Sequence, residues 1–551
     1  MPNSYENFID AVDGYNLHLT LNATIQYYAE RILQEGIETF EVRNGGFCII
    51  MDPKTGAIYA MANVPNYDLN NPRAVADEET LEKLAQMKAD PSVTEEQYLK
   101  ALGDAQFEQW RSKAVNDTYE PGSTFKSLVV AAALEEGAVN ENTSFYCTGS
   151  VQLAGFTIRC HKRTGHGSQT LREAVMNSCN PAFIAIGQKL GAEKFYQYLE
   201  DYGLLTTTGI DMQGEGKGNV WDRNFFLSEQ GISSLATASF GQRLTVTPIS
   251  LITAAASVIN GGYLMEPYVL ESVTDQAGNT VSVQEPTVVR QVISEQTSEK
   301  VRSILESVVG DGGTGKNAYV AGYRIGGKTG TSETLVKDEF IVSFLGFAPA
   351  DDPKVIVLLA YDSPTPNSPG SNYTSGGWYI SGGNMAALMA GRLIGDVLDY
   401  MGVEKQYTQD ELSGADTLVP KVTDVSLTEA QRPLKNSGLA WRVVGSGSAV
   451  TGQIPVQGAS IPKNSQVVLY LGEEKPTALI TVPDLTGLSP QTVRDRLQSA
   501  GLYLRATGAQ KYYTEDTIAA SQSVLGGTQV EPGSVIEVFF IDNQVRDYAA
   551  N

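Results

Sequence analysis

Residues 118–137 read TYEPGSTFKSLVVAAALEEG, and this stretch decides the fold and the chemistry that we expect. A Pro-Gly pair and Ser123 precede an apolar run that Gly137 closes, which is the pattern of a buried helix. Residues three apart on a helix share a face, so Lys126 is expected to place its amine beside the Ser123 hydroxyl. Burial disfavours a charged ammonium, which would let Lys126 act as a base for Ser123. The alternative is a helix-capping Ser123 with a solvated Lys126.

A second Ser-x-x-Lys sequence occurs at Ser460-Ile461-Pro462-Lys463. Pro462 lies inside it, and the surrounding residues are rich in Val, Ile and Tyr, which favours a strand. We therefore expect that this copy does not present a helical Ser-Lys face.

A triplet, Ser178-Cys179-Asn180, separates two helical patterns at residues 171–177 and 181–190. A tight corner between helices can direct a hydroxyl and an amide into a cleft. We expect Ser178 to relay a proton to a leaving nitrogen and Asn180 to hold an amide of the substrate. Helix capping is the alternative role for a triplet of this kind.

The triplet Lys328-Thr329-Gly330 lies in an extended segment, residues 323–332, in which glycines flank the lysine. Glycines allow another backbone to approach closely, as when a peptide adds along a strand edge. Lys328 can meet a carboxylate, and Thr329 and Thr331 offer hydroxyls. The same three residues at positions 54–56 follow Asp-Pro between two apolar runs, which indicates a hairpin turn.

The remaining patterns predict an α+β domain. We expect a helix at 22–40, a hairpin at 46–63, a charged and exposed helical insertion at 77–113, and a mostly helical stretch at 119–205. Strands are expected at 324–332, 340–347 and 354–361, followed by a closing helix at 384–401.

Together the three motifs resemble those of class B penicillin-binding proteins, the membrane-anchored D,D-transpeptidases of peptidoglycan. Further segments carry the resemblance across residues 13–398: DPKTG at 52–56, YEPGS at 119–123, GHG at 165–167, VTP at 246–248, NGG at 260–262 and FLGFAP at 344–349. The triplet at 178–180 and the nearby Cys160-His161 are most similar to the sporulation-type enzymes.

The resemblance implies a five-stranded antiparallel sheet between helices, with an all-helical lobe alongside. It also implies acyl transfer from a D-Ala-D-Ala stem peptide through Ser123. Backbone N–H groups of Ser123 and Thr331 would stabilise the oxyanion, while Lys328, Thr329, Gly330 and Thr331 would bind the substrate. β-Lactams would leave Ser123 acylated.

Beyond residue 406 the chain repeats itself, since Pro420 and Pro483, and likewise Leu439 and Leu502, are 63 residues apart. Each copy resembles a PASTA repeat, whose family role is recognition of cell-wall peptide or β-lactam-like ligands; a passive spacer is the alternative. We expect a transpeptidase domain at 1–405, linkers at 406–417 and 474–480, repeats at 418–473 and 481–542, and a tail at 543–551.

Charge and composition limit the partners. The net charge is −23 and there is no basic tract, so nucleic acid is not an expected partner. No signal peptide and no run of 18 apolar residues is present. The resemblance nevertheless implies the extracytoplasmic face of the cell membrane, so we expect that the anchor was cut off or, as the alternative, that a partner supplies it. Wall-synthesis proteins of division or sporulation, such as a glycosyltransferase, are expected partners.

Histidine and cysteine offer few other chemistries. His18, His161 and His166 are the only histidines, which disfavours a Ser-His-Asp triad. Twelve residues separate Cys147 from Cys160 without a metal knuckle, so we expect no metal and no cofactor. A reversible disulfide between Cys160 and Cys179, opened by a thiol reductase, would move the 178–180 corner. A buried thiol and a rival bond to Cys147 are the alternatives.

Three other functions share parts of this pattern. A β-lactamase needs a downstream base such as Glu in a Glu-x-x-Leu-Asn setting, and we find none. A D,D-carboxypeptidase would use the same residues with water as acceptor. A non-catalytic wall-binding receptor is the alternative from another class, and an intact Ser-Lys pair counts against it.

Overall fold

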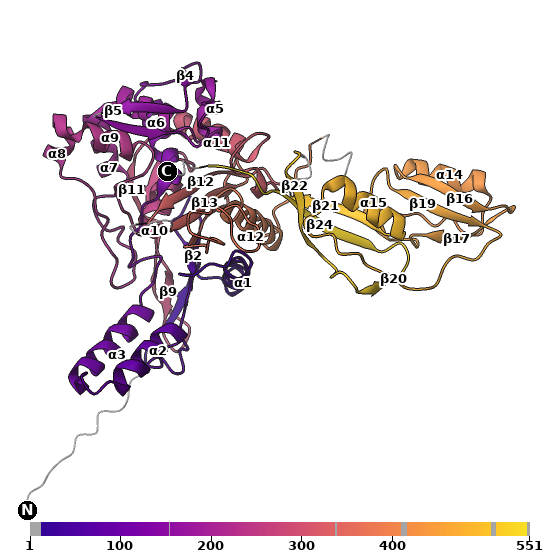
Figure 1. Ribbon diagram of the computed structural model, residues 1–551, viewed down its shortest axis with the longest axis horizontal. Helices are drawn as coiled ribbons and strands as arrows, with labels where there is room; N and C mark the ends of the chain where they lie inside the picture. Colours follow the sequence, from indigo (N-terminus) through magenta and orange to yellow (C-terminus); the bar gives the residue numbers. More distant parts are fainter. Residues whose placement is uncertain are drawn as a thin grey trace, which may run out of the picture.

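The computed structural model describes residues 13–153, 155–334, 336, 339–408, 416–508 and 514–547. Its centre is a five-stranded, wholly antiparallel sheet in the order β12-β13-β14-β2-β3 (Figure 1). The bounds are β12 Gly326–Glu333, β13 Phe340–Ala348, β14 Val355–Asp362, β2 Gly46–Met51 and β3 Ile58–Val64. The predicted α+β class and the five-stranded sheet are confirmed.

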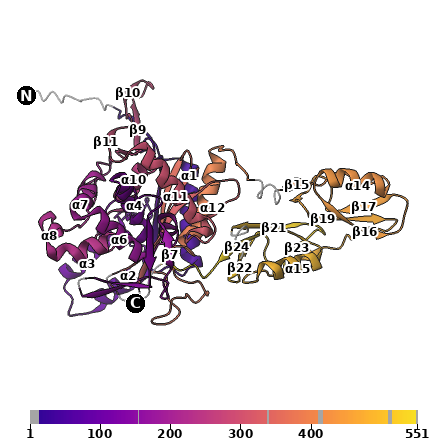
Figure 2. The ribbon, with the colours of Figure 1, turned by 90° about the horizontal axis from the view of Figure 1, so that it is seen from above.

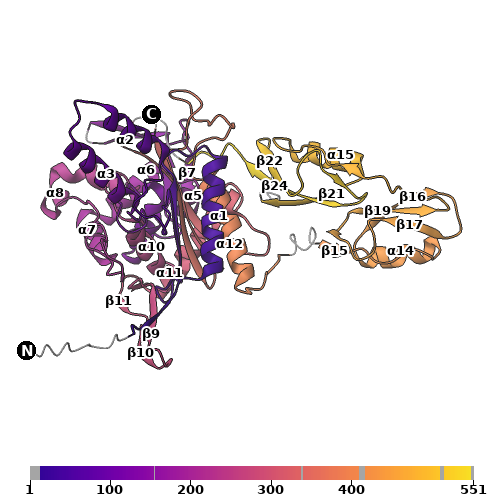
Figure 3. The same cartoon turned by 90° about the horizontal axis from the view of Figure 1, so that it is seen from below.

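Both faces of this sheet are buried, and the side chains of β2 contribute alternately to the hydrophobic core on each face. Successive strand residues point to opposite faces. Phe47, Ile49 and Met51 therefore pack with the helical lobe, whereas Cys48 and Ile50 pack on the other side. That other side is covered by α1 (Ala23–Thr39) and α12 (Ala386–Tyr400), which lie side by side (Figure 3).

The helical lobe covers the opposite face and carries two of the three motifs. Its central helix, α4 (Lys126–Glu135), is buried along almost its whole length. Around it lie α5 Leu171–Met176, α6 Asn180–Leu190, α7 Ala192–Asp201, α8 Arg223–Leu227, α9 Ile232–Ala238, α10 Pro248–Ser257 and α11 Glu295–Val309, with the 3₁₀ turns η1 Gly122–Phe125, η2 Glu229–Gly231 and η3 Lys316–Ala318. Short strand pairs border the lobe: β4 Ser144–Cys147 with β7 Gly167–Thr170, β5 Ser150–Leu153 with β6 Phe156–Arg159, and β8 Tyr263–Met265 with β11 Val288–Gln291.

Two projections extend from this domain. The charged insertion forms α2 (Glu78–Ala89) and α3 (Glu95–Gln109), which pack on each other, and α3 has no buried residue. A small sheet of β1 (Asn16–Leu19), β9 (Leu270–Thr274) and β10 (Thr280–Val283) forms the second projection. Among the described residues, no helix combines the length and the apolar character needed to cross a bilayer.

Two similar modules follow the closing helix. The first contains β15 Asp416–Leu418, α14 Leu427–Asn436, β16 Ala440–Gly445, β17 Val450–Ile454, β18 Ser460–Pro462 and β19 Gln466–Leu471. The second contains β20 Ile480–Thr481, α15 Pro490–Ala500, β21 Tyr503–Gly508, β22 Thr517–Gln522, β23 Gln529–Val530 and β24 Val535–Asp542. In each, a central strand pairs in parallel with one neighbour and antiparallel with the other, which matches the internal repeat in the sequence.

The second module lies against the transpeptidase-like domain, and the first lies farther out (Figures 1 and 2). Ile541 of β24 is fully buried in the hydrophobic core that α12 and the central sheet form. The end of the second module is therefore part of the packing of the large domain, although the sequence pattern presents the module as separate.

Candidate active site

Ser123 lies on the 3₁₀ turn η1, and Lys126 begins α4. The expectation of an α-helical first turn is thus corrected to a 3₁₀ turn, in which residues three apart eclipse one another. Gly122 precedes Ser123 with φ +54°, and a Cβ there would lie 2.4 Å from the hydroxyl oxygen of Ser332 on β12. A glycine at this position lets the turn approach the strand that carries the third motif.

The amine of Lys126 is completely buried and points into the second motif. Its Nζ donates to the carbonyl oxygen of Ser178 at 2.7 Å, to Ser178 Oγ at 3.0 Å and to Asn180 Oδ1 at 2.7 Å. Burial lowers the pKa of Lys126 from 10.5 to about 7. In this state the three hydrogen bonds of the amine all go to the corner, and the expected bond to Ser123 is not among them. Catalytic hydrogen bonds often form only once substrate is present.

Ser178 holds the centre of the site through an unusual backbone conformation. Its φ is +50°, in the left-handed region that non-glycine residues seldom adopt. This turn between α5 and α6 places Ser178 Oγ within hydrogen-bonding distance of two amines, Lys126 Nζ at 3.0 Å and Lys328 Nζ at 2.9 Å. The predicted tight corner is present, and its hydroxyl joins the first motif to the third.

Lys328 and Thr329 are completely buried on β12, the edge strand of the sheet. Burial, followed by the neighbouring charge of Lys126, lowers the pKa of Lys328 well below its usual value. Thr329 Oγ1 donates to Thr314 Oγ1 at 3.1 Å. A Cβ on Gly330 would lie 2.5 Å from Ser343 Oγ, so only glycine fits there. The strand therefore holds a buried amine and two hydroxyls close to Ser178.

Thr331 is the point where the site meets the far end of the chain. Its Oγ1 accepts a hydrogen bond from the Gly382 backbone N–H at 2.9 Å and donates to Asp547 Oδ1 at 2.8 Å. Asp547 is 2% exposed, and its burial raises its pKa despite the Thr331 hydrogen bond and the charge of Lys328.

A cleft of about 270 Å³ connects these groups, and Ser123, Asn180, Thr331 and Asp547 all line it. Strand β6 and the segment at 240–243 complete its walls. A larger hollow of about 1960 Å³ between α12 and the two modules contains none of the motif residues. The smaller cleft is therefore the candidate active site.

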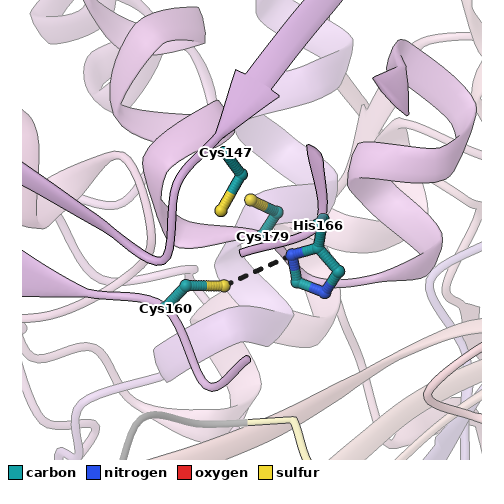
Figure 4. A group of neighbouring side chains, drawn as sticks. All are labelled: Cys147, Cys160, His166 and Cys179. Atoms are coloured by element: carbon teal, nitrogen blue, oxygen red, sulfur yellow. Dashed lines mark hydrogen bonds between the residues drawn. The ribbon is translucent and has the colours of Figure 1, made fainter. Parts of the chain in front are cut away.

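A cluster of three cysteines and one histidine lies directly behind the Ser178 corner (Figure 4). The donor atoms of Cys147, Cys160, His166 and Cys179 all lie within 4.8 Å of one another. Cys160 Sγ lies 3.4 Å from His166 Nδ1, and all four cysteines of the chain are free thiols here. Cys147 ends β4, Cys160 follows β6, His166 lies in the loop before β7, and Cys179 is the N-cap of α6.

The electrostatics of the cluster favour a thiolate. A hydrogen bond from Cys179 lowers the pKa of Cys160 to about 3, against the effect of burial, while the pKa of Cys179 is raised. Burial lowers the pKa of the neighbouring His161 to about 4. Three sulfurs and an imidazole form the donor set of a zinc site, with roughly 3.8 Å between tetrahedral donors. The fold brings Cys179 to Cys147, Cys160 and His166, so four donors meet although the sequence contains no metal knuckle.

The three predicted motifs meet around Ser178, and the two copied motifs lie elsewhere, as expected. Lys54 lies in the turn between β2 and β3, and Ser460 lies on β18 in the first module. Three residues at the site were missed: Thr314, Gly382 and Asp547. Gly382 follows Ser381 in a Ser-Gly-Gly-Asn run, a close-approach signal that could have been noticed.

Two family profiles match this chain, the first over the large domain and the second over both C-terminal modules. The profile of the penicillin binding protein transpeptidase domain matches residues 46–377, and that of the PASTA domain matches 417–473 and 480–541. Stage V sporulation protein D of Bacillus subtilis is 37% identical over 488 residues, which is 86% of this chain and 68% of that protein. A peptidoglycan D,D-transpeptidase FtsI homolog of Mesostigma viride is 29% identical over 65% of this chain and 59% of that protein.

Solved structures agree on the fold. The D,D-transpeptidase domain of a peptidoglycan glycosyltransferase from Eggerthella lenta has a TM-score of 0.57 at 26% identity, covering 71% of this chain and 84% of that one. The transpeptidase domain of Burkholderia pseudomallei penicillin-binding protein 3 has a TM-score of 0.55 at 25% identity, covering 71% and 98%. The chain spans 68% and 59% of the length of the relatives from Bacillus subtilis and Mesostigma viride.

Proposed function

We propose that this chain, which belongs to the penicillin-binding protein transpeptidase family, cross-links peptidoglycan stem peptides through an acyl-enzyme on Ser123. The observation that carries the mechanism is the pair of buried lysines, Lys126 and Lys328, which share the hydroxyl of Ser178. Relatives named peptidoglycan D,D-transpeptidases support the reaction type and the substrate class.

In the first step, Lys126 takes the proton of Ser123, and Ser123 Oγ attacks the carbonyl carbon between the two D-Ala residues of a stem peptide. The lowered pKa of Lys126 supports this role, because a neutral amine is available near pH 7. The hydrogen bond to Asn180 would keep the amine positioned once its bond to Ser178 is exchanged for one to Ser123.

The tetrahedral oxyanion would be stabilised by the backbone N–H groups of Ser123 and Thr331. The close approach of η1 to β12 at Gly122 and Ser332 supports this pairing. When the peptide bond breaks, Ser178 would donate its proton to the departing D-Ala nitrogen and regain one from Lys126. Lys328, Thr329 and Thr331 would hold the carboxylate of that D-Ala.

In the second step, an amine from a neighbouring stem peptide attacks the acyl-enzyme, forms the cross-link and releases Ser123. If water were the acceptor, the same residues would make a D,D-carboxypeptidase. β-Lactams would acylate Ser123 because they present the same carbonyl and carboxylate.

The test is a reaction of purified protein with a fluorescent penicillin and then with a D-Ala-D-Ala stem peptide plus an amino acceptor. We expect covalent labelling and a cross-linked product. Release of D-Ala with no cross-link would indicate a carboxypeptidase. An intact protein that neither labels nor releases D-Ala would contradict the proposal and favour the wall-binding receptor.

The cysteine cluster supports a second role, control of the Ser178 corner. Cys179 lies between Ser178 and Asn180, so any bond to its sulfur fixes the two groups that bind Lys126. A Cys160–Cys179 disulfide is one way to do this, and a thiol reductase would then be a partner. The convergence of four donors within 4.8 Å favours a bound Zn²⁺ instead.

Metal analysis of protein purified without added metal, combined with thiol titration, separates these two roles. One Zn²⁺ per chain, lost in Cys147→Ser and in His166→Ala, would support the metal. A Cys160–Cys179 peptide in a non-reducing digest, with no metal, would support the disulfide. Cys48 is buried in the other core and serves as the matched control, since Cys48→Ser should change neither result.

Localisation and partners follow from the resemblance. We propose that the domain works on the extracytoplasmic face of the membrane, together with wall-synthesis proteins such as a glycosyltransferase. The two PASTA domains would contact cell-wall peptide or act as a spacer. Retention on sedimented peptidoglycan of the full chain, compared with a chain ending near residue 406, distinguishes binding from spacing.

A further inference from the structure

The segment that follows β24 returns to the transpeptidase domain and reaches the active-site cleft at Asp547. Asp542, the last residue of β24, forms a buried ion pair with Lys316. Its backbone exchanges two hydrogen bonds with the side chain of Asn317, one at 2.9 Å and one at 3.0 Å. The second PASTA domain is thus fixed to η3 at the point where the segment begins.

Residues 543–546 are then held against the loop at 373–384 by side chains and backbone groups. The Gln544 side chain accepts from the Tyr373 hydroxyl at 2.9 Å, and the Arg546 guanidinium lies 5.5 Å from the centre of the Tyr379 ring. The carbonyl oxygen of Val545 accepts from Ser381 Oγ at 2.8 Å and from Asn384 Nδ2 at 3.1 Å. This is an ordered path with a defined register.

The path places the carboxylate of Asp547 on Thr331, in the cleft that Ser123 lines. Oδ1 accepts the Thr331 hydrogen bond, and although burial raises the pKa of this carboxyl, the Lys328 charge, the Thr329 hydroxyl and the Gly383 backbone N–H also lower it. A Cβ on Gly382 would lie 3.0 Å from Asp547 Oδ2, so the glycine leaves room for the carboxylate. Polar groups of the substrate-binding strand thus hold this carboxylate, while burial disfavours its charged form.

We propose that residues 543–547 are a built-in competitor of the substrate, in which the Asp547 carboxylate occupies the subsite for the terminal carboxylate of the acyl donor. This inference rests on the proposed function, because it takes Thr331 and Lys328 as the residues that bind that carboxylate. A stem peptide enters when the segment withdraws.

Because the segment continues β24, the position of the second PASTA domain decides access to the cleft. A ligand or wall contact that moves this domain away from Lys316 and Asn317 would also withdraw Asp547. The arrangement thus gives a PASTA domain a direct connection to catalysis, through five residues of backbone.

Competition of this kind has a quantitative signature. If the segment occupies the subsite about nine-tenths of the time, the apparent affinity for penicillin falls about tenfold, and removing the segment restores it. The acylation rate at saturating penicillin does not change, because at saturation the competitor is displaced. A purely structural role for Asp547 would not produce this split.

The experiment compares penicillin acylation of the full chain with that of Asp547→Ala, Asp547→Asn and Tyr373→Phe. Glu531→Ala, an exposed acidic position on the second PASTA domain, is the matched control. We expect Asp547→Ala to lower the half-saturating penicillin concentration about tenfold with an unchanged maximal rate. Asp547→Asn should give an intermediate shift and Tyr373→Phe a smaller one, with Glu531→Ala unchanged.

Equal half-saturation in all variants would overturn the inference, and so would a change in the maximal rate alone. If Asp547→Ala did not fold, Tyr373→Phe and a free peptide of residues 543–547 added to that variant would decide, since the peptide should raise half-saturation. Labelling of every protein with no shift contradicts only this inference. Absence of labelling in every protein contradicts the proposed function.

Discussion

The chain contains the triplet Lys-Thr-Gly twice, and the two copies have nothing else in common. At 54–56 the triplet forms the turn between β2 and β3, where Lys54 is half exposed and forms a surface ion pair with Asp352. At 328–330 it lies on the edge strand β12, where Lys328 is fully buried and donates to Ser178 Oγ at 2.9 Å. An exposed ion pair contributes little, while a buried amine has a strongly shifted pKa.

The two Ser-x-x-Lys sequences likewise lie in different structural settings. Ser123 and Lys126 lie on a buried helical turn, whereas Ser460 to Pro462 form strand β18, where alternate side chains point to opposite faces. Residue identity does not make a motif reactive. Burial, and neighbours that come from distant parts of the chain, make it so.

Replacing each of the two serines, Ser123 and Ser460, by alanine should give the largest difference in penicillin labelling. We expect Ser123→Ala to reduce penicillin labelling by about a thousandfold or more, since the nucleophile is lost. Ser460→Ala should label like the parent. Fluorescent gel labelling measures both, and thermal unfolding confirms that each variant is folded. Persistent labelling of Ser123→Ala would remove the distinction between the motif and its copy.

The two lysines allow the same comparison. Lys328→Ala should lower the acylation rate about a hundredfold, because it removes a buried positive group from the carboxylate subsite and from Ser178. Lys54→Ala should change the rate less than twofold, given its exposed partner. Stopped-flow acylation with penicillin measures both. Similar losses in the two variants would show that the effect is on stability and not on the site.

The pH dependence tests the burial of Lys126. Its pKa is lowered to about 7, so the amine is protonated below that pH and cannot accept the Ser123 proton. We expect the acylation rate to rise about tenfold per unit up to pH 7 and to level off above it. Cys160, Cys179, Lys328 and Asp547 are the other titratable groups that act on Lys126. A midpoint near 10 would mean that Lys126 is solvated in the working enzyme, which would contradict this account.

Removal of the copy at 460–463 together with both PASTA domains should leave the maximal acylation rate unchanged. Because residues 543–547 are removed as well, the half-saturating penicillin concentration should fall as it does in Asp547→Ala. A chain ending near residue 406 should remain folded and acylable by penicillin, because all three motifs lie before it. Losing the buried contacts of Ile541 and the ion pair of Asp542 should lower the thermal stability of the truncated chain. A soluble truncated chain that no longer reacts would show that the repeats complete the active site.

The sequence carried enough information for the sheet, the motifs and the repeats, because each has a local pattern of spacing or periodicity. It could not reveal the left-handed Ser178 or the 3₁₀ turn at Ser123, since several backbone conformations suit those residues. Asp547 was missed for another reason. Its partner Thr331 lies 216 residues away, and no local pattern encodes such a contact.

Peptide mapping by mass spectrometry after reaction with penicillin tests the central claim most directly. The account predicts one covalent adduct per chain, located on Ser123, and its disappearance in Ser123→Ala. An adduct on Ser178, on Ser460 or on any other serine, or no adduct on a folded chain, would contradict it.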